Sequence, residues 1–346
     1  MSLKCRWQLY GFSILSFLSL LATEPSDSPQ CALGSFYGYT TALGVRGTLK
    51  PPDVATDEVK QILEGENIPT PCPFEPDELN SACVECQDPN YIYCNVTESL
   101  INEDLDGLEK INFLRIDTES LHQIKSRFVG KLDVKTLEIK YTGHFSFDFD
   151  LLSDIQNLRA LIIRSPKTVV IHRSNSNFVF TGLENLTSLY MENHIKWDVN
   201  TTGKEIIFPN LKVLVLRSDS HLFISPDTFK WLRKSPVTHL YIQNTFFNVK
   251  KCQEILVPLQ STLTFLDASG STFEDNSRPT QEQPFQNILK KLMIGLQSKE
   301  NNSTSIQGLS LANSQLTSIP YKALYIVRRS LQYLSLSRNN LDSLSF

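Results

Sequence analysis

The chain lacks the short motifs on which many enzymes and nucleotide-binding proteins depend. It has no G-x-S-x-G nucleophile turn, no H-E-x-x-H zinc motif, no G-x-G-x-x-G loop and no phosphate-binding loop. It also has no long basic run, and its formal net charge is −4. We therefore expect neither an enzyme nor a partner of nucleic acid, with no catalytic residue and no cofactor.

The histidines form no cluster of metal ligands. Six histidines are scattered along the chain, at positions 122, 144, 172, 194, 221 and 239. His144 and His221 share one phase of the repeat described below, but several repeats separate them. Solvated turn histidines are the better interpretation, so no metal site is expected.

Long apolar stretches are absent after residue 22, where no segment approaches the ~18 residues of a membrane span. The first residues differ, because Lys4 and Arg6 precede an apolar run over 9–22. This arrangement predicts a secretory signal peptide at 1–23. We therefore expect a soluble, secreted chain without a membrane span, or the ectodomain of a cell-surface protein if the chain is a fragment.

The chain is rich in one repeated leucine pattern, seen most clearly in LQYLSLSRNNLDSLSF (331–346). Leu334 and Leu336 have the period of a strand, and Asn339 precedes a return to Leu341 and Leu344. The pattern L-x-x-L-x-L-x-x-N-x-L is that of a leucine-rich repeat. Equivalent strand leucines stand at 114, 137, 161, 189, 214, 240, 266, 309 and 334.

These strand leucines are 23 to 28 residues apart, except for one interval of 43. Their spacing predicts an α/β solenoid over 106–346 with about nine repeats, a horseshoe whose parallel β-sheet is concave. The long interval contains an insertion at 274–305, with helical apolar spacing from Phe285 to Leu296 after Pro284. Core packing is the favoured role of that helix. No C-terminal cap is recognisable.

The asparagine position of the repeat is degenerate. It is occupied by Glu119, Thr142, Pro166, His194, Asp219, Thr245, Ser271, Ser314 and Asn339. Most of these side chains form local hydrogen bonds readily, so an imperfect ladder is expected, with an irregularity at Pro166.

Four of the seven cysteines cluster before the first repeat, namely Cys72, Cys83, Cys86 and Cys94. Zinc is one alternative for this cluster, but a secretory route favours disulfides in a cap at 72–105. Cys31 and Cys252 remain, with three alternatives. They form a disulfide with each other, Cys252 is a buried free thiol, or one of them is linked to another chain. Residues 24–71 are expected to form a loosely ordered extension with one short helix at 55–63.

Together, the repeats and the cysteine cluster resemble animal extracellular leucine-rich-repeat proteins. Toll-like and chaoptin-like receptor ectodomains and small secreted arthropod leucine-rich-repeat proteins are the nearest in layout. The resemblance implies the pairs Cys72–Cys86 and Cys83–Cys94. It also implies a non-enzymatic protein that binds a protein or other macromolecule, as the N-terminal part of a receptor ectodomain in innate immunity or cell adhesion. The alternative is a secreted, non-catalytic partner subunit, and a homodimer or receptor complex is compatible with either.

The ligand-binding prediction rests on the residues that should face outward on the concave side. Ile162, Tyr190, Val215 and Tyr241 form an apolar and aromatic column in the central repeats, flanked by Arg164 and Arg217. Tyrosine and arginine often dominate interface energies, although strand propensity alone also favours such residues. We expect this exposed stripe to contact the ligand.

Five N-x-S/T triplets agree with a secretory route. They stand at Asn95, Asn185, Asn200, Asn301 and Asn302. Asn301 and Asn302 overlap, so only one of them is expected to carry a glycan.

Overall fold

The computed structural model describes 16 stretches of the chain. They are 83–85, 90–96, 110–118, 133–141, 145–148, 155, 157–165, 169–172, 183–192, 195–198, 208–224, 228–247, 252–271, 284–298, 300 and 302–341. These residues fall into two compact units. The N-terminal unit holds the described residues up to 222 together with 231–239, and the C-terminal unit holds 223–230 and 240–341.

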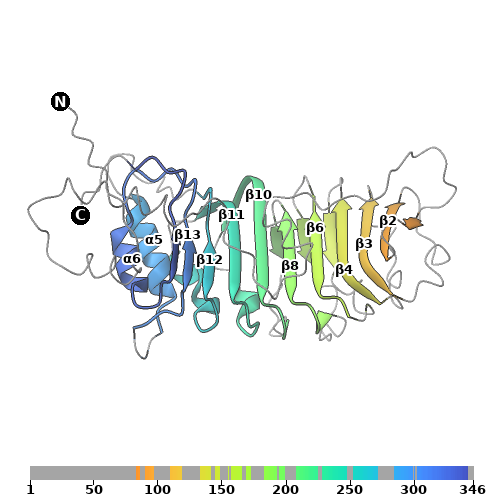
Figure 1. The fold of residues 1–346 in the computed structure, drawn as a ribbon, viewed down its shortest axis with the longest axis horizontal. Coiled ribbons are helices and arrows are strands. Elements are labelled where there is room, and N and C mark those ends of the chain that lie inside the picture. The colour runs from red at the N-terminus through yellow and green to blue at the C-terminus, as the bar shows by residue number, and fades with distance from the viewer. Residues whose placement is uncertain are drawn as a thin grey trace, which may run out of the picture. The chain divides into compact units, whose positions relative to one another are not determined.

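The N-terminal unit is a row of strands stacked in chain order (Figure 1). The strands are β1 (Cys83–Glu85), β2 (Tyr91–Val96), β3 (Ile111–Thr118), β4 (Val134–Tyr141), β6 (Ala160–Arg164), β8 (Ser188–Glu192) and β10 (Val213–Ile224). Only β1 and β2 pair antiparallel in this row, and every later neighbour pairs parallel. Parallel neighbours joined in chain order make a solenoid-like α/β arrangement.

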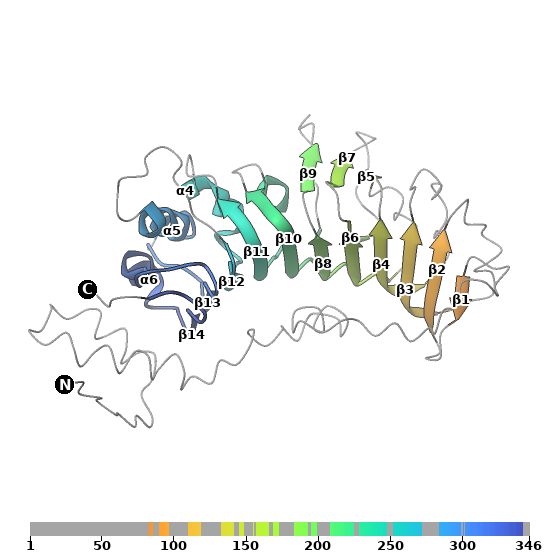
Figure 2. The same ribbon diagram turned by 90° about the horizontal axis from the view of Figure 1, so that it is seen from above.

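A second, three-stranded parallel sheet was not anticipated from the sequence. It consists of β5 (Phe145–Asp148), β7 (Val169–His172) and β9 (Ile195–Asp198). Figure 2 shows these strands beyond the carboxyl ends of β4, β6 and β8, each of which leads into one of them. Three successive repeats therefore contribute one strand to each of two sheets.

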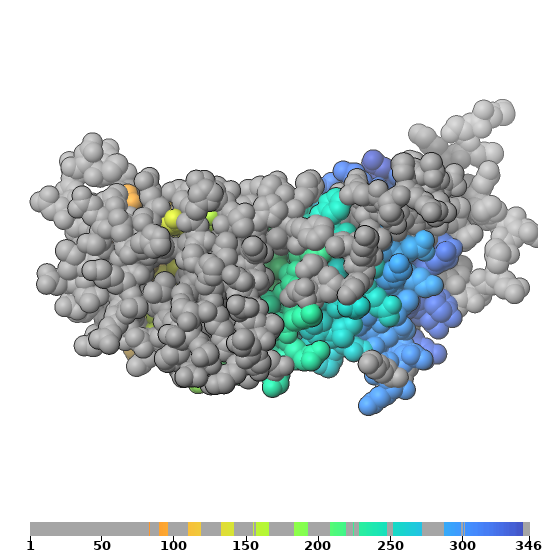
Figure 3. All heavy atoms as spheres, turned by 180° about the vertical axis from the view of Figure 1, so that it is seen from behind, coloured from red at the N-terminus to blue at the C-terminus, as the bar shows by residue number. Residues whose placement is uncertain are grey.

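The C-terminal unit combines short parallel strands with helices. Its elements are β11 (His239–Phe247), α4 (Cys252–Ile255), η6 (Val257–Leu259), β12 (Phe265–Asp267), α5 (Pro284–Gly295), β13 (Gly308–Ser310), α6 (Tyr321–Val327) and β14 (Tyr333–Ser335). A short 3-10 turn, η5 (Lys230–Leu232), precedes β11 in the chain. Helix α5 packs against both α4 and α6, and residues of this unit are cyan to blue in Figure 3.

Each predicted strand leucine lies in an observed strand, and neighbouring leucines stand opposite one another. Leu114, Leu137, Leu161, Leu189 and Leu214 form one such line in the N-terminal unit, and Leu266, Leu309 and Leu334 form another in the C-terminal unit. All of these except Leu334 are at most 1% exposed. The prediction of stacked leucine strands is thus confirmed for the described residues.

The helix predicted in the insertion is also confirmed, since α5 begins at Pro284 and ends at Gly295. Its apolar residues Ile288, Leu289, Leu292 and Met293 are buried. Spacing of three and four residues places them on one helix face. Packing of that face holds the insertion against the unit.

A ladder of side-chain hydrogen bonds connects the asparagine positions of the C-terminal unit. The Asn339 side chain accepts hydrogen bonds from the backbone N–H groups of Ser314 (2.9 Å) and Leu316 (3.0 Å) and donates to the carbonyls of Leu311 (2.8 Å) and Leu336 (2.9 Å). One repeat earlier, Ser314 Oγ donates to the carbonyl of Ala268 at 3.3 Å.

The ladder continues with hydroxyl groups in the preceding repeats. Ser271 Oγ donates to the carbonyl of Ile242 at 3.0 Å and lies 2.8 Å from Thr245 Oγ1. Thr245, Ser271 and Ser314 are buried, so these bonds satisfy backbone groups that water does not reach. The predicted ladder is present at these positions, whereas Pro166 lies outside the described residues.

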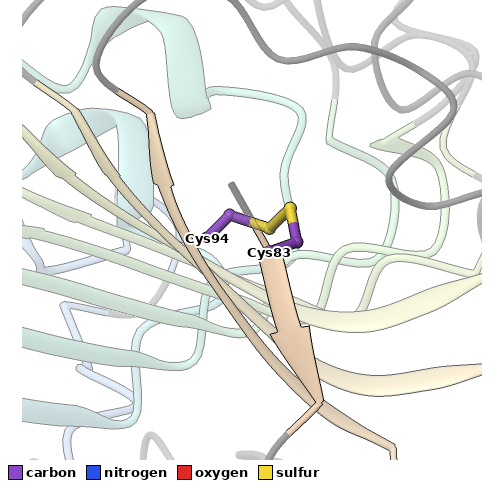
Figure 4. Close-up of a disulfide and its surroundings, with 2 residues drawn as sticks. All are labelled: Cys83 and Cys94. Atoms are coloured by element: carbon purple, nitrogen blue, oxygen red, sulfur yellow. A yellow bond between two sulfur atoms is a disulfide. The ribbon is translucent and has the colours of Figure 1, made fainter. Parts of the chain in front are cut away.

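A disulfide joins Cys83 to Cys94 across the antiparallel pair of β1 and β2 (Figure 4). Cys252 is a buried free thiol at the start of α4, which is one of the three alternatives given for this residue. Burial raises the pKa of this thiol, while Lys291 acts in the opposite direction. Cys72, Cys86, Cys31, the signal peptide and the 24–71 extension lie outside the described residues.

Candidate binding face

The face of the N-terminal sheet opposite the strand leucines carries two rows of side chains. The middle row follows each strand leucine by one position and consists of Arg115, Glu138, Ile162, Tyr190 and Val215. The charged row follows each leucine by three positions and consists of Asp117, Lys140, Arg164, Glu192 and Arg217. Alternation along a strand places both rows on one side of the sheet.

The apolar part of the middle row is buried, contrary to the expected exposed stripe. Ile162 and Tyr190 are 0% exposed and Val215 is 1% exposed. Their neighbours in register stand on strands about 4.8 Å away, which already removes much of their surface from water. The expectation that these side chains are exposed was therefore wrong.

Arg164 also covers part of the Tyr190 side chain. Its guanidinium carbon lies 5.5 Å from the ring centroid of Tyr190, in a cation–π contact. Its Nε lies 2.6 Å from Glu138 Oε1, and its Nη1 lies 3.7 Å from Glu192 Oε2. Arg164, on β6, thus links carboxylates on β4 and β8 and also lies over Tyr190 of β8.

A second ion cluster lies at the β3 end of the same face. Arg115 Nε and Nη2 donate to the two carboxylate oxygens of Asp117 at 2.8 and 3.1 Å. Lys140 Nζ lies 3.9 Å from the same carboxylate, and Tyr93 donates to it at 3.3 Å. Arg115 also lies over the Tyr93 ring at 5.6 Å.

The charged row keeps contact with solvent, unlike the middle row. The side chains of Asp117, Lys140, Arg164 and Glu192 are between 18% and 48% exposed, and Arg217 is part-buried. The sequence-based choice of Arg164 and Arg217 thus selected accessible residues. It overlooked Glu138 and Glu192, although each stands next to an arginine in register, Glu138 beside Arg115 and Glu192 beside Arg217.

Tyr190 has an unusual environment on this face. Burial raises the pKa of its hydroxyl to about 12, and Glu192 adds to the rise. The positive charges of Arg164 and Arg217 oppose that rise in pKa. The hydroxyl is fully enclosed and meets hydrogen-bond geometry with no group, Arg217 included.

Tyr241, the remaining residue of the predicted stripe, belongs to the C-terminal unit. It is 2% exposed and packs on Phe265 at 5.4 Å between ring centroids. Phe265 in turn covers Gly308, where an added Cβ would lie 2.4 Å from the ring. Tyr241 was therefore also wrongly expected to be exposed.

The described residues also bear on the expectations for metals, membrane spans and glycans. No group of three metal-ligating side chains occurs within the described stretches, and no helix in them is long and apolar enough to cross a membrane. Asn95, Asn185 and Asn302 are exposed, while Asn200 and Asn301 lie outside the described residues.

No protein-family model matches the chain, and no curated protein is similar to it in sequence.

Proposed function

We propose that this chain is a non-enzymatic extracellular binding protein that recognises a protein or other macromolecular ligand. In this proposal the fold is a leucine-rich-repeat solenoid with a disulfide-stapled N-terminal cap. The chain acts as the recognition part of a receptor ectodomain. The two lines of stacked strand leucines, five in one unit and three in the other, and the Asn339 ladder support the repeat. The Cys83–Cys94 bond supports a route through an oxidising compartment.

The charged row is the observation that carries the binding proposal. Five charged side chains stand on five neighbouring parallel strands, all on one face and all at least partly accessible. Ion pairs hold Asp117 and Arg164 in fixed positions, so little side-chain entropy remains to be lost when a partner contacts them. A preorganised row of this kind supplies specificity through charge complementarity.

The ligand is expected to contact the charged row above the buried middle row. Ile162, Tyr190 and Val215 then support the row from beneath instead of inserting into the partner. Substituting them should lower stability, whereas substituting accessible charges should lower affinity without unfolding the protein. This separation makes the proposal testable without knowledge of the partner.

The test compares affinity capture from extracellular material by the full secreted chain and by a Lys140→Glu, Glu192→Lys variant. This variant reverses two accessible charges and leaves the Arg164–Glu138 pair intact. The expected result is loss of at least one captured partner, with the melting temperature within a few degrees of wild type. Arg159→Glu, an exposed cation before β6, is the matched control and should retain that partner. Identical capture by all three proteins would refute the proposal.

A further inference from the structure

Arg217 differs from the other arginines on the binding face because its charge has no counter-ion. Arg115 is paired with Asp117, and Arg164 is paired with two carboxylates. Among the described residues Arg217 forms no ion pair, and its buried Nε has no hydrogen-bond partner. Glu192 stands opposite it in register, but the carboxylate of Glu192 faces Arg164 instead.

The Tyr190 hydroxyl supplies a second unused polar group beside Arg217. Val215, which precedes Arg217 by two positions, is the register partner of Tyr190 on the adjacent strand. Arg217 is close enough to affect the titration of the hydroxyl, and the hydroxyl itself is enclosed without a partner. A buried donor left unsatisfied typically costs ~1–3 kcal/mol. Arg217, which is part-exposed, is therefore the cation of this face that an external acceptor can pair with.

The charge of the whole face restricts what that acceptor is. The two rows contain four cations, Arg115, Lys140, Arg164 and Arg217, and three anions, Asp117, Glu138 and Glu192. The single excess cation matches one monovalent carboxylate. A sulfated glycan or nucleic acid would instead bring many negative charges close to Glu138 and Glu192. A fork of guanidinium N–H donors also fits the geometry of a carboxylate.

We propose that Arg217 binds an aspartate or glutamate side chain presented by a polypeptide partner. The carboxylate approaches the part-exposed side chain of Arg217 from solvent and accepts hydrogen bonds from its terminal N–H groups. This inference rests on the proposed binding function and specifies the chemistry that the partner brings to the β10 end of the charged row. It makes Arg217 the anchor of the interface.

Peptide display tests this proposal without a known partner. Random peptides are selected on the full secreted chain, and the winning sequences are measured against variants. The expected result is one indispensable acidic position, with affinity falling about tenfold or more in Arg217→Gln. Tyr190→Phe removes only the enclosed hydroxyl and should lower affinity less than Arg217→Gln does.

Charge exchange gives the decisive readout. Arg217→Glu should abolish binding of the acidic peptide and restore binding of the same peptide with lysine at the acidic position. Lys212→Glu, an exposed cation preceding β10, is the matched control and should leave both affinities unchanged. Arg217→Gln provides the same comparison if Arg217→Glu does not fold.

Three outcomes would overturn the inference. They are the absence of any selected peptide, winning peptides whose binding ignores Arg217, and tighter Arg217-dependent binding of heparin than of every acidic peptide. Failure of the Arg217 proposal is distinguishable from failure of the proposed binding function. Partner capture that depends on Lys140 and Glu192 would still support the charged row even if Arg217 contributed nothing.

Discussion

Arg164 Nε lies 2.6 Å from Glu138 Oε1, and the Glu138 side chain is only 2% exposed whereas that of Arg164 is 26% exposed. The arginine therefore neutralises a carboxylate that water barely reaches. The second oxygen of Glu138 has no hydrogen-bond partner, so this ion pair is the main compensation for burying the charge.

Arg164→Ala should lower the free energy of unfolding of the N-terminal unit by about 2–3 kcal/mol, because it leaves Glu138 buried and unpaired. Replacing both residues, as Arg164→Met with Glu138→Leu, should recover most of that loss. Urea unfolding measures both variants, with Arg159→Ala as the exposed control. A double variant as unstable as Arg164→Ala would show that the unpaired carboxylate is not the cause.

Asn339→Leu should destabilise the C-terminal unit by about 2–4 kcal/mol, because it leaves two N–H and two carbonyl groups without their side-chain partner. Asn339→Asp keeps the acceptor but not the donor and should fall between Asn339→Leu and wild type. The neighbouring Asn340 is exposed, so Asn340→Ala is the control. Equal midpoints of chemical unfolding for Asn339→Leu and Asn340→Ala would contradict the ladder's role.

Acidification should weaken the fold through His239. Burial lowers the pKa of this imidazole below its usual value of 6.5, and its Nδ1 lies 2.9 Å from Thr238 Oγ1. Since the unfolded chain then takes up the proton more readily, the stability contributed above pH 6.5 is lost as the pH falls toward the lowered pKa. His239→Asn should flatten the decline of the melting temperature between pH 7 and 5. An unchanged slope in that variant would assign the decline to other groups.

Gly295 and Gly308, both tightly packed in the C-terminal unit, should respond differently to alanine. A Cβ at Gly295 would lie 2.1 Å from the backbone carbonyl oxygen of Gln253, whereas one at Gly308 would meet the Phe265 side chain. Backbone of α4 yields less easily than a ring, so Gly295→Ala should cost about 2–3 kcal/mol. Gly308→Ala should cost less and should be relieved by Phe265→Leu. Differential scanning calorimetry would contradict this account if Gly308→Ala proved the more damaging change.

The stacked strands of this protein could be predicted from the sequence alone. All but one of the intervals between the strand leucines from Leu114 to Leu334 are 23 to 28 residues, and a repeat of that length can bury its leucines only against the next copy. The α5 helix was equally visible, because its apolar spacing is local. Both features depend on neighbours along the chain, which a sequence displays directly.

Tertiary structure decided which residues of the outward face meet water. Alternation along a strand predicted that Ile162 and Tyr190 point away from the leucines. It could not predict that other side chains bury them. Tyr190 is covered in part by Arg164, whose side chain also reaches Glu138, 26 residues earlier in the chain. The sheet of β5, β7 and β9 was hidden for a similar reason, since its strands pair only across repeats. The side-chain contacts between repeats thus depend on how neighbouring strands align in the folded protein. The repeats themselves could be predicted, because the spacing of their leucines is visible in the sequence.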